Sequence, residues 1–355
     1  MKEKILISVL LVLATLAGCK PDDDDTQHNV KVNEQSVLSD FAYVVANPNY
    51  EDLQQKANEL NVAVQTLDNF PTQINLEAAQ DAWRAVRIPW EQAEGFLFGP
   101  AEDFNYDPAT DTWPVNTVEL DSLLASSNPL TLADIDSLQF ALKGYHPIEY
   151  VLFGVGGSKT IAQLTSRERQ YMISLTQSLY NAVTALRNSW DVSQPDNFTV
   201  QLVTAGNGST RFATRKDAFI AIASAMEGIC NEVANGKMDK PLAAHDSTLV
   251  ESQYAHNATT DFKNNIIGVQ NVYLCRYAST GTSLHNLVAE KNASLDNDIQ
   301  AQLNAAIASL DLLDPNFGVA IFTQQGQIQE AQDAINILKG SLNNLINFIQ
   351  TNITD

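Results

Sequence analysis

The stretch LQQKANELNVAVQTL, residues 53–67, decides the fold class. Its apolar stripe consists of Leu53, Leu60, Val64 and Leu67. These positions fall on one face of a helix with 3.6 residues per turn. The same period recurs along most of the chain, and no run of useful length alternates between apolar and polar residues. The sequence therefore predicts an all-α protein.

Outward from this stretch, an irregular segment separates two sets of helical patterns. Residues 191–208 contain Pro195, Asn197, Gly206 and Gly208, which interrupt the helical pattern as is typical of a domain boundary. We expect one antiparallel helical bundle over residues 34–195 and a second over residues 205–355, packed side by side. A shorter break is expected at residues 47–49, where the sequence reads Asn-Pro-Asn.

The amino terminus has the features of a cleaved signal peptide over residues 1–18. Lys2 and Lys4 precede a short apolar segment, which is too brief to span a bilayer. Residues 16–19 read LAGC and match the lipobox, in which the thiol of Cys19 receives a diacylglycerol. An ordinary secretory signal with a chance cysteine is the alternative. We expect lipid chains on Cys19 to hold the protein at a membrane.

Residues 19–33 are predicted to form a disordered acidic stalk behind the lipid anchor. This segment contains four consecutive aspartates, residues 22–25, and has almost nothing apolar to bury. An acidic run in this position also resembles the surface-export signal of Bacteroidetes lipoproteins. The expected location is the cell envelope, as an outer-membrane lipoprotein, with surface exposure as a further expectation.

The net charge of the chain limits the classes of molecule that the protein is expected to bind. The chain has 42 acidic and 21 basic residues, and its formal net charge is −21. This acidity argues against nucleic acid as a partner and is compatible with attracting cations, although a solvated acidic surface is the simpler interpretation. Cys230 and Cys275 indicate neither a disulfide framework nor a thiolate metal cluster, and whether they pair stays open.

The most specific feature is GYHPIE, residues 144–149. His146 and Glu149 are three residues apart, so on a helix they project from one face and could share a cation or a proton. Pro147 either starts this helix or kinks a longer one. The alternative is a hydrogen-bonded structural pair.

A second segment, residues 83–100, supports a site. Trp83, Arg87, Trp90 and Glu91 recur at three- and four-residue spacings on one helix face. We expect Glu91 to be a metal ligand, and Trp83, Arg87 and Trp90 to contact a bound ligand. The alternative is a core stripe in which Arg87 forms an ion pair with Glu91.

A third polar segment, residues 251–265, begins at Glu251 and runs into an amphipathic helix. Ser252, Asp261 and Asn264 are its candidate ligand-binding residues. These side chains are also compatible with a solvated helix face.

These three segments, behind a lipoprotein signal, resemble the imelysin family, which includes the iron-regulated protein A group and the peptidase-like domain of the iron-uptake protein EfeO. The signature of that family, Gly-x-His-x-x-Glu, is present at Gly144, His146 and Glu149. The resemblance extends from about residue 35 to the end of the chain. It implies two helical bundles, a pocket where they meet, a role in iron uptake, and iron-transport proteins as partners.

The family also carries a metallopeptidase label. A catalytic zinc is commonly held by His-Glu-x-x-His or by the inverted His-x-x-Glu-His, but Tyr150 stands where the inverted motif needs its second histidine. The remaining histidines are scattered at His28, His245, His256 and His285. The sequence therefore favours a protein that binds a metal ion, iron or zinc, or a metal-bearing small ligand between the bundles. A metallopeptidase that uses His146 and Glu149 is the alternative, and a purely structural or adhesive protein is the third reading.

Overall fold

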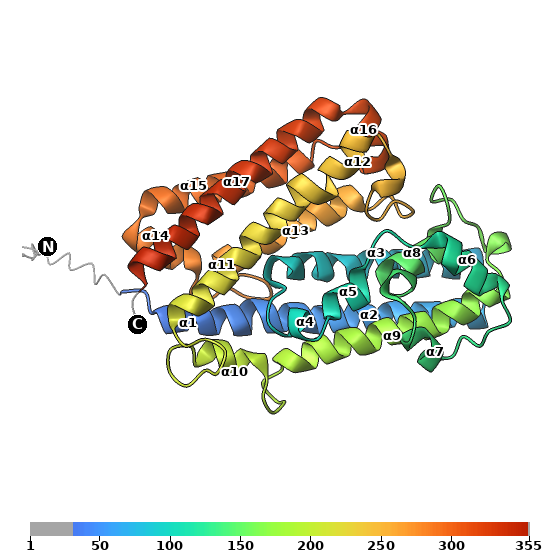
Figure 1. Ribbon diagram of the computed structural model, residues 1–355, viewed down its shortest axis with the longest axis horizontal. Coiled ribbons are helices and arrows are strands. Elements are labelled where there is room, and N and C mark those ends of the chain that lie inside the picture. Colours follow the sequence, from blue (N-terminus) through green and yellow to red (C-terminus); the bar gives the residue numbers. More distant parts are fainter. Residues whose placement is uncertain (1–30, 354–355) are drawn as a thin grey trace, which may run out of the picture. The chain divides into compact units, whose positions relative to one another are not determined.

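The computed structural model describes residues 31–353, which form helices and connecting loops (Figure 1). Extended backbone pairs within this range in a single antiparallel bridge, between Arg276 and Thr280. The all-α prediction is confirmed. The signal peptide, Cys19 and His28 lie outside the described residues, as does most of the expected stalk, so those predictions are not tested here.

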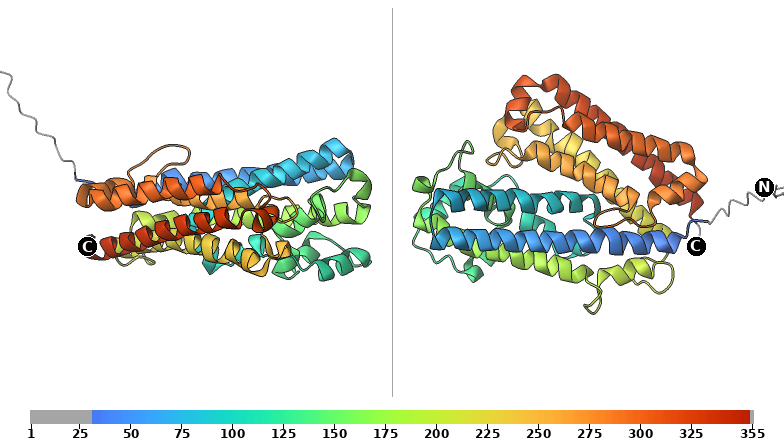
Figure 2. Two further views of the ribbon diagram at one scale, coloured as in Figure 1. Left: turned by 90° about the horizontal axis from the view of Figure 1, so that it is seen from above. Right: turned by 180° about the vertical axis from the view of Figure 1, so that it is seen from behind.

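The first group of helices is built along α2, which lies between α3 and α9 (Figures 1 and 2). Capping residues explain where these helices begin. Thr72 caps α3, and Thr165 and Glu168 cap α9 reciprocally. The longer helices of the group are α1 (Glu34–Asp40), α2 (Asn47–Asn69), α3 (Gln73–Ala93), α8 (Tyr145–Phe153) and α9 (Ser166–Trp190). The shorter ones are α4 (Pro100–Asp103), α5 (Tyr106–Asp111), α6 (Thr117–Ala125), α7 (Leu132–Asp136) and α10 (Phe198–Val203).

The break expected at residues 47–49 is wrong. A π-helical turn, η1 (Phe41–Ala46), joins α1 directly to α2, and Pro48 lies in the first turn of α2. The side-chain amide of Asn47 donates a hydrogen bond to the carbonyl of Ala42 at 2.8 Å. The backbone N–H of Asn47 donates to the same carbonyl, so Asn47 links the π-helical turn to the start of α2. The chain therefore stays helical from α1 to the end of α2.

The second group is built along α17, which packs against α11 and α15 (Figure 1). Thr214 and Asp217 form the reciprocal cap that starts α11. None of the helices between residues 31 and 353 is both long and apolar enough to cross a membrane. The helices are α11 (Arg215–Glu232), α12 (Asp239–Ala244), α13 (Ala258–Leu274), α14 (Leu284–Lys291), α15 (Ala293–Leu310), α16 (Phe317–Thr323) and α17 (Gln325–Asn352).

The two groups meet where α13 packs against α3 and the following 3₁₀ turn, η2 (Glu94–Phe96). A Cβ on Gly268 would lie 2.3 Å from the carbonyl oxygen of Gln92, and a Cβ on Gly95 would lie 3.1 Å from the backbone of Gly268. Glycine therefore lets the two backbones touch. This seam fixes the last turns of α3 against the middle of α13, and both helices carry predicted site residues.

From Val32 onward the chain forms one compact unit that contains both groups. The segment expected to be a boundary includes α10, whose carbonyls at Leu202 and Val203 accept hydrogen bonds from Gln35 in α1. The division into bundles at residues 34–195 and 205–355 stays a prediction. Cys230 and Cys275 are both free and buried, which resolves the question of their pairing.

Candidate functional site

Helix α8 begins with the Gly-x-His-x-x-Glu signature. Gly144 precedes it with φ of +89°, and a Cβ there would lie 2.2 Å from the carbonyl oxygen of Thr110 in α5. Only glycine lets the start of α8 come this close to α5. Pro147 lies in the first turn, so it starts the helix and does not kink it. His146 and Glu149 are both buried on the side of α8 that faces the second group.

Glu149 fixes the orientation of the His146 ring. Its Oε2 lies 3.0 Å from His146 Nδ1, and its Oε1 accepts hydrogen bonds from the backbone N–H groups of Tyr254 and Ala255, each at 2.8 Å. His146 Nε2 then points toward Asp111, whose Oδ1 lies 3.1 Å away. Burial lowers the pKa of His146, but the adjacent carboxylates of Asp111 and Glu149 outweigh burial and raise it to about 10.

Arg87 lies at the centre of the site and is completely buried. Its guanidinium forms ion pairs with Glu91 and Asp111. Its Nη2 also lies 3.1 Å from Glu251 Oε1 and 3.6 Å from Asp261 Oδ2. The Arg87–Glu91 pair that the helical spacing suggested is present, and tertiary packing adds two carboxylates from the second group and one from α5.

The two tryptophans of α3 form the wall behind this arginine. Trp83 donates its indole hydrogen bond to the backbone carbonyl of Tyr145 at 2.9 Å, and Trp90 donates to Asp111 Oδ2 at 2.6 Å. The Arg87 guanidinium lies 5.0 Å from the centre of the Tyr145 ring and 5.9 Å from that of Trp83. These aromatic faces stabilise the buried cation and exclude water from one side of it.

A second buried cation comes from the other group of helices. Lys237 ends a π-helical turn, η5 (Val233–Lys237), that follows α11. Its ammonium lies 2.8 Å from Glu94 Oε2, 3.2 Å from Glu251 Oε2 and 3.7 Å from Glu91 Oε2. Lys237 therefore links Glu91 in α3 and Glu94 in η2 to Glu251, which precedes α13.

Carboxylates outnumber cations in this charged cluster, which we define as Arg87, Lys237, His146 and six acidic residues. The acidic residues are Glu91, Glu94, Asp111, Glu149, Glu251 and Asp261. Burial and repulsion from Glu91 outweigh the attraction of Lys237 and raise the pKa of Glu251 to about 7. Burial likewise raises the pKa values of Glu94 and Asp261 well above their usual range. At Asp111, burial is outweighed by Arg87 and His146, which hold its pKa well below the usual range.

Three buried atoms of the cluster have no hydrogen-bond partner: Arg87 Nε, which is a donor, and the possible metal-ligand atoms His146 Nε2 and Glu251 Oε2. The two ligand atoms matter for the site. Each has a charged neighbour within ion-pair distance, but the direction of the contact does not suit a hydrogen bond. Asp111, His146 and Glu251 each offer one ligand atom, and these atoms all lie within 4.8 Å of one another. One imidazole and two carboxylates in this arrangement could hold a metal ion.

The candidates of the third polar segment lie in two places. Ser252 donates a hydrogen bond to Asp261 Oδ2 at 2.5 Å, which puts both residues at the edge of the charged cluster. Asn264 instead accepts a hydrogen bond from Gln92 at 2.8 Å in the seam between α3 and α13. The next residue, Asn265, donates to two cluster carboxylates.

Sequence reasoning missed Asp111 and Lys237 and did not select Glu251 as a candidate. Asp111 lies in a segment rich in aspartate, and Lys237 lies in a polar turn, so neither residue carries a local sign of burial. Glu251 is adjacent to Ser252, which was selected. Of the other histidines, His285 lies apart from the site and forms its own pair with Asp296 at 2.6 Å.

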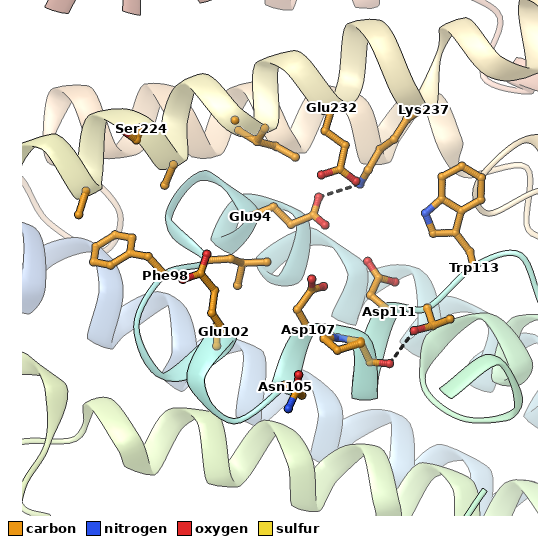
Figure 3. Close-up of a pocket in the computed structure, with 18 of the residues that line it drawn as sticks. Glu94, Phe98, Glu102, Asn105, Asp107, Asp111, Trp113, Ser224, Glu232 and Lys237 are labelled. Carbon is orange, nitrogen blue, oxygen red and sulfur yellow. Dashed lines mark hydrogen bonds and ion pairs between the residues drawn. The ribbon is translucent and has the colours of Figure 1, made fainter. Parts of the chain in front are cut away.

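A chamber of about 800 Å³ lies beside the charged cluster (Figure 3). Glu94, Asp111 and Lys237 form its inner wall, and the dashed line between Glu94 and Lys237 in Figure 3 marks their ion pair. Helices α4 and α5 line one side and α11 lines the other. His146 and Glu251 are not part of its lining, so a ligand in the chamber meets Asp111 first.

Known proteins resemble this chain along most of its length. Iron-regulated protein A of Synechococcus elongatus is 28% identical over 310 residues, which cover 84% of this chain and 83% of that protein. A crystal structure of a protein from Parabacteroides distasonis, provisionally named an iron-regulated protein A precursor, has a TM-score of 0.83 and 25% identity. The match covers 90% of this chain and 96% of the Parabacteroides distasonis chain.

An imelysin-like protein from Psychrobacter arcticum shares the fold, with a TM-score of 0.71 and 14% identity over 88% of this chain and 95% of that one. The model of the family described as imelysin, peptidase M75, matches residues 46–345. That match spans α2 to α17 and includes the signature at the start of α8. The chain therefore belongs to the imelysin family.

Proposed function

We propose that this protein binds a metal cation, with iron as the first candidate, at Asp111, His146 and Glu251. The observation that carries the proposal is the geometry of this buried triad, in which one ligand atom from each residue lies within 4.8 Å of the other two. His146 Nε2 and Glu251 Oε2 lack a well-directed hydrogen bond, and a bound cation would satisfy both atoms. An imidazole with two carboxylates suits Fe²⁺ and Zn²⁺ better than a soft metal ion.

The neighbouring residues have supporting roles in this proposal. Glu149 holds the Nδ1 side of His146, as an outer carboxylate does when it orients a histidine ligand. Glu91, which the sequence suggested as a ligand, is held by Arg87 and contributes negative charge near the ion. The cation itself supplies positive charge where the described carboxylates exceed the cations.

Iron is the first candidate because two of the similar proteins carry the name iron-regulated protein A. We extend that connection to this chain as a role in iron uptake at the cell envelope. We further propose that lipid chains on Cys19 tether the protein to the outer membrane, where iron-transport proteins would be its partners.

The hydrogen bonds that Glu149 already makes favour metal binding over peptide hydrolysis as the function of the site. A zinc peptidase needs a carboxylate that is free to take a proton from the metal-bound water. Glu149 already accepts hydrogen bonds from the backbone of Tyr254 and Ala255 and holds His146. It is therefore placed to position a ligand and not to act as a base.

The test is calorimetric titration of the full chain, purified without an affinity tag and stripped of metal. Fe²⁺ under anaerobic conditions, Fe³⁺ and Zn²⁺ are titrated separately. We expect His146→Ala and Glu251→Gln to lower affinity for the bound ion by at least about tenfold, roughly 1.4 kcal/mol, with unchanged helicity. Glu149→Gln should lower affinity by a similar factor, because it releases the imidazole from its fixed orientation.

The matched control is His285→Ala. His285 is also hydrogen-bonded to a buried carboxylate, that of Asp296, but lies outside the charged cluster. Its loss should leave metal affinity unchanged. The proposal fails if the wild-type chain binds none of the three ions, or if His146→Ala and His285→Ala give the same isotherm as wild type.

A further inference from the structure

The chamber beside the charged cluster is much larger than a metal ion requires. Its volume of about 800 Å³ is in the range of pockets that hold small organic molecules. Its inner wall is shared with the cluster, but the remaining lining is not used by the proposed metal site. The aromatic part of that lining consists of Phe98, Trp113 and Phe212.

One side of the chamber is a helix face from which large side chains are missing. Ala221, Ser224, Ala225 and Gly228 lie at three- and four-residue spacings on α11 and line the chamber. A Cβ built on Gly228 meets no atom within 4 Å. Packing therefore does not require a glycine here, although glycine is among the least favourable residues inside a helix. Its effect is to keep the chamber open.

The chamber lining has more acidic than basic side chains. Arg211 is already paired with Asp103 and Lys237 with Glu94. Three carboxylates remain, on Glu102 of α4, Asp107 of α5 and Glu232 of α11 (Figure 3). In the described part of the chain, none of these three forms an ion pair or a side-chain hydrogen bond.

We propose that the chamber binds a small aliphatic amine with two or three ammonium groups. Carboxylates on both sides of the chamber would pair with ammonium groups at separate points along such a molecule. The methylene chain would lie along the small-residue face of α11, and the aromatic rings would add cation–π attraction. The chamber lining includes no histidine, and its three free carboxylates lie on three different helices, so this site differs from the buried triad.

The binding test uses spermidine as the probe and the metal-free full chain, titrated at physiological ionic strength. The neutral diol 1,8-octanediol tests whether charge is required. We expect saturable binding of spermidine and no heat from the diol. Asp107→Asn should lower spermidine affinity by at least tenfold. Glu330→Gln removes one exposed carboxylate from α17 that is not part of the chamber lining, and it should leave spermidine affinity unchanged.

A second pair of variants tests the shape of the chamber. Gly228→Phe projects a ring into the open space and should abolish spermidine binding. Gly340→Phe is the matched control, because Gly340 is also an exposed helical glycine whose Cβ would meet nothing within 4 Å. Circular dichroism on each variant verifies that the helices are retained.

Three results would overturn the amine site: no saturable binding to wild type, equal binding of the diol, or equal losses in Asp107→Asn and Glu330→Gln. The metal titration is read separately on the same proteins. Asp107→Asn keeps the metal ligands of the triad and should retain metal affinity. In the wild-type chain, metal binding without spermidine binding rejects this inference alone. The reverse result rejects the metal proposal alone.

Discussion

Replacing Arg87 by methionine tests whether the buried charges of the site balance as the structure indicates. Arg87 contacts four carboxylates, and methionine keeps much of its volume while removing the charge. Removing one partner from a buried ion pair costs about 3–5 kcal/mol, because the opposite charge is left uncompensated. The variant can regain balance only by binding another proton or a metal ion.

The cost of that proton sets the pH dependence. A carboxylate with a pKa near 4 must be held protonated at pH 8, which costs roughly four times about 1.36 kcal/mol, or about 5 kcal/mol. At pH 5 the same proton costs only about 1.4 kcal/mol. We therefore expect Arg87→Met to lose about 3–5 kcal/mol of unfolding free energy at pH 8 and about 1–2 kcal/mol at pH 5.

Urea unfolding of the metal-free chain, followed by far-ultraviolet circular dichroism at both pH values, measures these losses. Arg84→Met is the control on the same helix. Its side chain is 41% exposed and lies 3.5 Å from Asp81, so its loss should be about 1 kcal/mol or less at either pH. A loss for Arg87→Met below about 1 kcal/mol at pH 8, or one that is the same at both pH values, would refute the reasoning.

Three further outcomes are expected. Folding raises the pKa of Glu251 to about 7 and that of His146 to about 10, so the folded chain binds more protons than the unfolded chain. The stability of the metal-free protein should therefore fall as the pH rises from about 5 through 7 toward 10. Urea midpoints that rise over this range would contradict this prediction. Gly268→Ala should lower the unfolding free energy by about 1–3 kcal/mol, because its methyl group clashes across the α3–α13 seam. At Gly340 a methyl group has open space, so Gly340→Ala should be neutral or stabilising. Thermal melts of the two variants measure the difference. Cys19→Ser should move the protein from the membrane fraction to the soluble fraction, and retention in the pellet after a high-salt wash would show that the lipobox interpretation is wrong.

Rules that depend only on residues close together in the sequence predicted most of the helices and part of the site. The spacing of Leu53, Leu60, Val64 and Leu67 predicts a helix because the helical period is set by neighbouring residues. The same rule placed His146 and Glu149 on one face. A different local rule, that proline and asparagine interrupt a helix, failed at Pro48, because a π-helical turn leads directly into α2 and Pro48 lies in the first turn of that helix.

The other half of the site depends on contacts between distant parts of the chain. Asp111 and Lys237 lie in polar segments, where charged residues are normally solvated, so nothing local indicates that they are buried. Asn264 and Asn265 are neighbours on one helix, and only the packing of α13 on α3 decides which of them reaches the carboxylates.

Helix periodicity and side-chain spacing are local properties, so the order of residues is enough to predict a helical chain and a motif of Gly144, His146 and Glu149. Only the tertiary structure decided that Arg87 and Lys237 share a buried cluster with more carboxylates than two cations can neutralise, and that a chamber opens beside it. The physical reason is that burial and charge–charge interactions depend on distances in space, which residue spacing along the chain does not set.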